Sequence, residues 1–265
     1  MSKQNQLEEK EMSFLDHLEE LRWRLVRSVI AILVFAIAMW FVKEWVIQHL
    51  FIAMTKPDFI SFRLLCQWFS ICTDEIPVNF QSVKVGSQFT YALLLCFVGG
   101  FIAAFPYVFH QIWGFIKPGL RENEIKAVSG ITFYVTLLFL TGVVFGYLVV
   151  APLCIQFFGY FTISPEFKNI WMIGSFMSLI ISSVIFTGLL FLLPVIIYIL
   201  SKIGLVTPAF LKKYRKHAII VVLILSAIIT PPDFISQVIV SIPIIILYEV
   251  GIIISKRIEK ARKLV

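Results

Sequence analysis

Charged residues are scarce in this chain of 265 residues, and their scarcity limits the kind of protein it can be. Asp, Glu, Lys and Arg make up 15% of the sequence, whereas about 25% is usual in a soluble domain. Hydrophobic residues make up 59%, so too little polar surface is left to cover a soluble globule. The apolar residues form long continuous runs instead of short alternating strands, which excludes an outer-membrane barrel. The composition therefore predicts an all-α polytopic membrane protein.

The sequence also lacks the motifs of several enzyme classes. It contains no phosphate-binding Gly-Lys-Ser/Thr loop, no His-Glu-x-x-His and no Gly-x-Ser-x-Gly, which argues against an ATPase, a metalloprotease and a serine protease. The four cysteines have no metal-ligand spacing, and we expect no cofactor. We attribute the net charge of +7 to loops held on the cytoplasmic side of a membrane, and not to a nucleic-acid partner.

Six apolar segments are long enough, or nearly so, to cross a bilayer. A hydrocarbon core about 30 Å thick needs roughly 20 apolar residues in a helix. Within a single domain over residues 1–265, the predicted spans are residues 25–42, 89–113, 128–150, 171–200, 218–229 and 234–254. Pro231, Pro232 and Asp233 separate the last two, because paired prolines end a helix and Asp caps the next one. The leader, residues 1–24, is predicted to form an amphipathic helix on the cytoplasmic surface.

The distribution of Lys and Arg predicts the orientation of these spans. Most of the 23 basic residues fall in the leader, in the second and fourth loops and in the tail. Basic loops stay in the cytoplasm, so both termini are predicted to be cytoplasmic and the first, third and fifth loops to face outward. The first outward loop, residues 43–88, is long, and its Cys66 and Cys72 could pair in an oxidising compartment.

Acidic and basic residues stand at helical spacing just before the first span. Glu20 and Arg24 are four residues apart and would form an ion pair on one helix face. Asp16 with Glu19, or Ser13 with Asp16, fits a capping box. These explanations are purely structural. The functional alternative is a surface carboxylate that holds a cationic ligand.

The second cytoplasmic loop offers further carboxylates next to aromatic residues. Glu122 and Glu124 stand where the third span begins, a place where negative charge suits the helix dipole. The loop and the leader share one face of the membrane. Carboxylates flanked by aromatic rings would fit an arginine, because a guanidinium forms bidentate bonds to a carboxylate and stacks on rings.

Two features of the spans allow both a structural and a functional interpretation. Glu249 lies inside the sixth predicted span, where a carboxylate is costly and suggests function. The structural alternative is that it reaches the membrane interface or pairs with Lys256. An alternative function for the whole chain is a small-solute secondary transporter with Glu249 as its coupling residue. Gly142 and Gly146 have the spacing that allows helices to approach closely, and we expect them to serve packing.

Four stretches of the sequence resemble the TatC family, the multispanning subunit of the twin-arginine (Sec-independent) protein translocase. They are residues 17–24, residues 111–120, residues 230–237, and in the sixth predicted span residues 242–243 with 248–251, in the order in which the family has them. The resemblance implies six helices in a cupped, glove-like bundle in the bacterial cytoplasmic membrane. It further implies a core subunit and signal-peptide receptor that exports folded proteins, driven by the proton-motive force and without nucleotide hydrolysis.

The resemblance also implies partners and site residues. The partners would be twin-arginine signal peptides and TatA- and TatB-like single-span proteins, which would form a hetero-oligomer with the chain in the lipid bilayer. Glu20 and Glu124 match the positions that hold the arginines. Further positions of the family's motifs, implied to bind the signal peptide, are matched by Gln111, Arg22, Phe115 and Pro118. Structural or partner roles are implied for Pro231, Pro232, Asp233 and Glu249.

One residue departs from the pattern of the family. Typical members carry a Glu in the fourth span that faces the concavity, whereas this chain has Leu192. Either contacts with partners then depend on other polar residues, such as Gln88, Thr187 or Glu249, or the arrangement of the partners differs.

Overall fold

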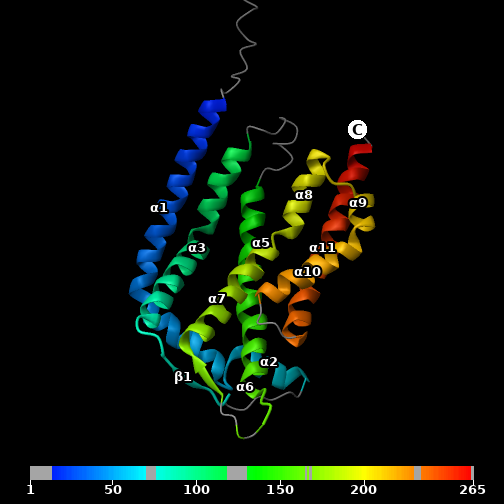
Figure 1. Cartoon of the computed structure of the whole chain (residues 1–265). Helices are drawn as coiled ribbons and strands as arrows, with labels where there is room; N and C mark the ends of the chain where they lie inside the picture. Colours follow the sequence, from blue (N-terminus) through cyan, green and yellow to red (C-terminus); the bar gives the residue numbers. More distant parts are fainter. Residues whose placement is uncertain are drawn as a thin grey trace, which may run out of the picture.

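The structure, a computed structural model, shows long helices standing side by side (Figure 1). It describes residues 14–69, 76–117, 130–164, 166, 169–229 and 234–263. Helix α1 begins and helices α3, α8 and α11 end at one end of the bundle, which we call the upper end. Helix α2, strand β1 and the end of α6 lie at the opposite, lower end.

The first half of the chain holds two long helices and a folded connection between them. The elements are α1 (Phe14–Val46), the helical turns η1 (Ile47–Phe51) and η2 (Ile52–Thr55), α2 (Ile60–Phe69), β1 (Asn79–Gln81) and α3 (Ser87–Ile116). The connection packs against the bundle, because Phe51, Met54 and Phe62 are buried in one cluster with Ile155 and Ile180. Cys66 on α2 is disulfide-bonded, and Cys72 lies outside the described residues.

The second half of the chain contains shorter helices. The elements are α5 (Ile131–Phe145), η4 (Gly146–Val150), α6 (Ala151–Tyr160), β2 (Ile170–Met172), α7 (Ile173–Leu190), α8 (Leu193–Ile203), α9 (Pro208–Lys213), α10 (Arg215–Ile229) and α11 (Phe234–Lys263). Pro231, Pro232 and Asp233, between α10 and α11, lie outside the described residues.

Four helical segments in the described part of the chain are long and apolar enough to cross a membrane. They are His17–Leu64, Ser87–Ile116, Ile131–Tyr160 and Ile173–Ile203. The first four predicted spans lie mostly or wholly within them. The remaining two predicted spans fall on α10 and α11, which are 15 and 30 residues long. The chain is thus a mostly helical, multi-pass membrane protein.

Two prolines shape the helices differently from what the sequence suggested. Helix continues past residue 150 to Tyr160, because Pro152 lies in the first turn of α6, directly after the wider π-helical turn η4. A proline there removes no regular hydrogen bond. The predicted span 171–200 is two helices instead of one: the chain turns at Phe191 and Leu192, and Pro194 lies in the first turn of α8, where proline is well tolerated.

Gly142 and Gly146 bring α5 and η4 against α7. A Cβ on Gly142 would lie 2.9 Å from the Cα of Gly188, and one on Gly146 would lie 2.8 Å from the carbonyl oxygen of Ser183. Both neighbours are backbone atoms of α7, so only glycine allows this separation. The prediction that the two glycines serve helix packing is confirmed.

A short parallel sheet at the lower end was missed by the all-α prediction. β1 pairs with β2, with Asn79 opposite Ile170 and Gln81 opposite Met172. Strands of three residues are too short to show an alternating pattern. Because β1 precedes α3 and β2 is followed at once by α7, the pair joins the lower ends of these two helices.

Candidate functional site

The candidate site lies between α1 and α3 at the upper end, and small residues of α3 allow these helices to approach each other. A Cβ on Gly100 would lie 2.6 Å from the backbone nitrogen of Ala36 on α1. Nearer the upper end, Gly114 faces the side chain of Arg24: a Cβ on this glycine would lie 2.1 Å from the Nη1 atom. The close approach sets α1 residues of the predicted motif directly against α3.

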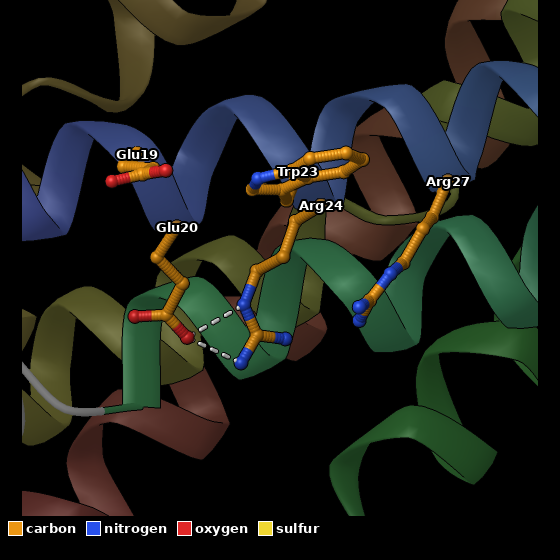
Figure 2. Close-up of a pocket in the computed structure, with 5 residues that line it drawn as sticks. All are labelled: Glu19, Glu20, Trp23, Arg24 and Arg27. Atoms are coloured by element: carbon orange, nitrogen blue, oxygen red, sulfur yellow. Dashed lines mark hydrogen bonds and ion pairs between the residues drawn. The ribbon is translucent and has the colours of Figure 1, made fainter.

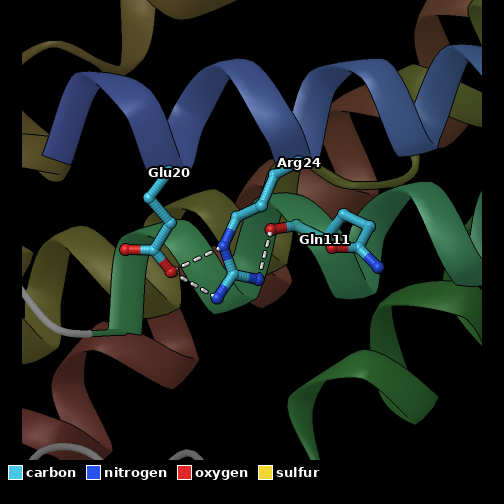
Figure 3. Close-up of polar contacts among 3 residues, drawn as sticks. All are labelled: Glu20, Arg24 and Gln111. Carbon is cyan, nitrogen blue, oxygen red and sulfur yellow. Dashed lines mark hydrogen bonds and ion pairs between the residues drawn. The ribbon is translucent and has the colours of Figure 1, made fainter. Parts of the chain in front are cut away.

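Glu20 and Arg24 form an ion pair on α1 that reaches α3 (Figure 3). Arg24 donates from Nε to the Oε1 of Glu20 at 2.8 Å, and from Nη2 to the same oxygen at 2.6 Å. Its Nη1 donates to the backbone carbonyl of Gln111 on α3 at 3.4 Å. The predicted pairing of Glu20 with Arg24 is therefore confirmed, and the arginine additionally joins the two helices.

The second carboxylate oxygen of Glu20 is left without a partner. Oε2 is buried and accepts no hydrogen bond from the described residues. A buried carboxylate oxygen without a donor is costly. Glu20 thus holds an internal guanidinium on one oxygen, while its buried second oxygen is not satisfied by any described residue.

An open pocket of about 490 Å³ surrounds this pair, lined by Glu19, Glu20, Trp23, Arg24 and Arg27 (Figure 2). The two carboxylates and the two guanidinium groups cancel in formal charge. The exposed Trp23 offers an aromatic face to a cation. The pocket therefore combines acidic acceptors with a ring, as expected for a guanidinium site, but its own arginines neutralise it.

Of the residues predicted to bind a ligand, three come together in the described structure. Gln111 is buried and takes part through its carbonyl. Phe115 stacks on His17 of α1, with ring centroids 4.3 Å apart and planes at 15°, beside Glu20. Arg22 is exposed on α1 and does not line the pocket. Glu124 and Pro118 lie outside the described residues.

Residues that sequence reasoning did not assign to the site complete it. Arg24 appeared only as a helix-stabilising partner, and His17, Trp23 and Gly114 carried no role. The stacking of His17 and the space left by Gly114 depend on how α1 lies on α3. Periodicity within one helix carries no information about that contact.

Glu249 is paired with a residue of the neighbouring helix. Its Oε1 lies 2.5 Å from the Nε of Arg215 at the start of α10. The alternative of pairing with Lys256 is wrong, because a residue seven positions further along α11 is about 10 Å away along the axis. Tyr248 donates a hydrogen bond to the carbonyl of Leu211 at 2.9 Å, which ties α11 to α9.

Leu192 lies in an apolar environment. At the turn between α7 and α8, it packs against a buried cluster that contains Phe105, Trp113 and Phe139. The position at which the family resemblance implies an acidic residue is therefore a partly buried leucine packed against the hydrophobic core of this chain.

Comparison with known proteins shows which protein family the chain resembles. The model of the Sec-independent protein translocase protein (TatC) family matches residues 16–243. TatC of Blattabacterium sp. subsp. Periplaneta americana is 39% identical over 263 residues, covering 96% of this chain and 99% of that protein. TatC of Halalkalibacterium halodurans is 31% identical and covers 97% and 96%. A crystal structure of TatC, described as the twin arginine translocase receptor, matches with a TM-score of 0.73 at 27% identity, covering 92% of this chain and 99% of that one.

The long apolar helices and the matched structure define a multi-pass helical membrane protein that works in protein transport. The chain belongs to the TatC family. Its function is that of a TatC subunit in Sec-independent protein translocation, which is a transport function and not an enzymatic one. The resemblance seen in four stretches of sequence is confirmed, and family membership replaces the alternative of a small-solute transporter.

Proposed function

We propose that this TatC subunit is the core of the translocase and its receptor for twin-arginine signal peptides, with Glu20 accepting one of the two arginines. One observation carries the assignment: a guanidinium, that of Arg24, already lies on this carboxylate with two N–H groups on one oxygen. The site is therefore shaped for the group that the signal peptide would bring, and a guanidinium that replaced Arg24 and bound both oxygens would also satisfy the unpartnered Oε2.

Glu124 is our candidate for the second arginine. Its support is the sequence resemblance, together with the course of α3. The described part of that helix brings Phe115 against His17, one helical turn before Glu20 on α1, and Glu124 follows nine residues after Phe115 in the sequence. Two charge-assisted hydrogen-bonded contacts would each contribute roughly 1.5–3 kcal/mol to binding.

The proposal extends to orientation, partners and energy source. Six helices, α10 and α11 included, would cross the bacterial cytoplasmic membrane in a cupped bundle, with both termini and the upper end in the cytoplasm. Pro231, Pro232 and Asp233 would form the last outward turn. TatA- and TatB-like single-span proteins would join the chain in a hetero-oligomer. The proton-motive force would move folded cargo, since one charge crossing 100 mV gains about 2.3 kcal/mol.

Binding of a labelled twin-arginine peptide to the purified protein in mild detergent tests the role of Glu20. Glu20→Gln keeps the size of the side chain but removes its charge, so we expect the affinity to fall by about tenfold or more. Glu19→Gln is the matched control, because Glu19 lines the same pocket one residue away; its effect should be smaller. Undiminished binding by Glu20→Gln would reject Glu20 as the acceptor.

A further inference from the structure

We propose that Arg24 is a specificity-determining residue: it occupies Glu20 as an internal substitute for the signal-peptide arginine, so that a pair of arginines is needed to displace it. This inference rests on the function proposed above, in which Glu20 accepts an arginine. It adds a residue of the chain that competes with the ligand for the same carboxylate.

The contacts of Arg24 are more extensive than those of an ordinary surface ion pair. All three nitrogens of its guanidinium are engaged: two donate to the Oε1 of Glu20 and the third to the carbonyl of Gln111. Only 26% of its side chain is exposed. Gly114 lies directly under Nη1, so α3 carries a residue without a side chain at the point where the guanidinium rests.

An internal guanidinium on Glu20 raises the affinity that a ligand needs in order to bind this carboxylate. Arg24 is one helical turn from Glu20, so it competes as a tethered group with a high effective concentration. A ligand with a single arginine only replaces the guanidinium of Arg24 on Glu20 by its own, so the exchange brings no net binding free energy. A second arginine adds a contact that Arg24 cannot replace, at another acceptor of the site. Only a ligand with two arginines therefore gains binding free energy when it displaces Arg24.

The charge of the pocket also favours twin arginines over other basic ligands. Glu19 and Glu20 are balanced by Arg24 and Arg27, so a basic segment without the correct geometry experiences little net attraction. A lysine lacks the planar fork with which Arg24 holds one oxygen through two nitrogens. Twin lysines are therefore weaker competitors for Glu20 than twin arginines.

The first test measures affinities for three peptides that differ only in the pair: two arginines, arginine with lysine, and two lysines. Arg24→Gln should raise the affinity for all three by about two- to tenfold, and most for the peptides with lysine, so that discrimination decreases. Arg27→Gln is the matched control. It removes the same charge from the same pocket, and neither a hydrogen bond nor an ion pair links the described Arg27 to Glu20. Its effect on discrimination should be small.

A second variant displaces Arg24 without changing any charge. The Cβ of Gly114→Ala would lie 2.1 Å from Nη1, so the flexible end of Arg24 must move away. Discrimination should decrease in the same direction as for Arg24→Gln. Gly99→Ala is its control, because there the new Cβ meets only the side chain of Met39, in the same interface but far from Glu20. If Arg24→Gln fails to accumulate in the membrane, the discrimination measured for Gly114→Ala tests the proposal alone.

The outcomes separate this inference from the proposed function. If Glu20→Gln removes binding but Arg24→Gln and Gly114→Ala leave discrimination unchanged, or lower the affinity for twin arginines, Arg24 is no competitor and only the further inference is overturned. If the wild-type protein binds the peptides without any dependence on Glu20, both are overturned. Reduced discrimination in both variants, with discrimination nearly unchanged in both controls, supports the inference.

Discussion

Arg215 on α10 and Glu249 on α11 form an ion pair in which Nε and Oε1 are 2.5 Å apart. The carboxylate predicted to lie inside the sixth span thus has a partner from the neighbouring helix. The side chains are 55% and 33% exposed, so the pair is partly screened. The pair links α10 to α11.

We expect Arg215→Gln to lower the stability of the protein by up to about 1 kcal/mol, because it leaves Glu249 without its counter-charge. Thermal unfolding in detergent would measure this change. Lys216→Gln removes the same charge from the next, exposed position and should have little effect. The double variant Arg215→Gln with Glu249→Gln should recover part of the loss; a double variant as unstable as the sum of both single variants would contradict a direct pair.

Enlarging Gly146 should separate α5 from α7. In Gly146→Leu the new side chain would meet backbone atoms of Ser183 and Val184 at 2.8 and 2.9 Å, which cannot move aside. We expect a loss of about 1–3 kcal/mol, measured by thermal unfolding in detergent. Ala103→Leu is the control, since Ala103 is exposed on α3. Equal stability of the two variants would show that the close approach of α5 and α7 does not matter.

Introducing the acid that the resemblance implies should destabilise this chain. Leu192→Glu would place a carboxylate against the aromatic cluster around Phe105 and Phe139, at a desolvation cost. The thermal midpoint in detergent should fall, whereas Leu192→Met, which preserves volume, should change it by little. An unchanged midpoint for Leu192→Glu would mean that the site is polar enough for a charge.

Thiol labelling tests the proposed orientation. Cys66 lies on α2 at the lower end, which faces outward in our proposal. After reduction, a membrane-impermeant maleimide added to intact cells should label Cys66. The buried Cys96 on α3 should remain unlabelled and serves as the internal control. Labelling of Cys66 only after the cells are opened would place the lower end in the cytoplasm and reverse the topology.

The positions of the long helices could be predicted from the sequence, because they depend on local runs of apolar residues. Runs of apolar residues determine where the chain forms long helices, and the small residues Gly142 and Gly146 indicate where two of them meet. The residues at which the helices end were predicted less well. The third predicted span ended at residue 150, but helix continues through Pro152 because the preceding π-helical turn accommodates it. The strands β1 and β2 form only because tertiary structure brings them together.

For the candidate site, contacts within one helix could be predicted from the sequence, whereas contacts between helices could not. The pairing of Glu20 with Arg24 depends on spacing within α1 and was predictable. The carbonyl of Gln111 and the space over Gly114 belong to α3 and reach Arg24 only when the two helices pack. The partner of Glu249 was missed for the same reason, since Arg215 is distant in sequence and close only in space.

The pairing of β1 with β2 constrains the lower ends of two helices. Hydrogen bonds between these strands link the beginnings of α3 and α7, so these helix starts cannot separate without breaking the strand pair. The other end of α3 contacts Arg24 of α1 through the carbonyl of Gln111. The packing of α1 against this end of α3 can therefore change while the strand pair stays intact.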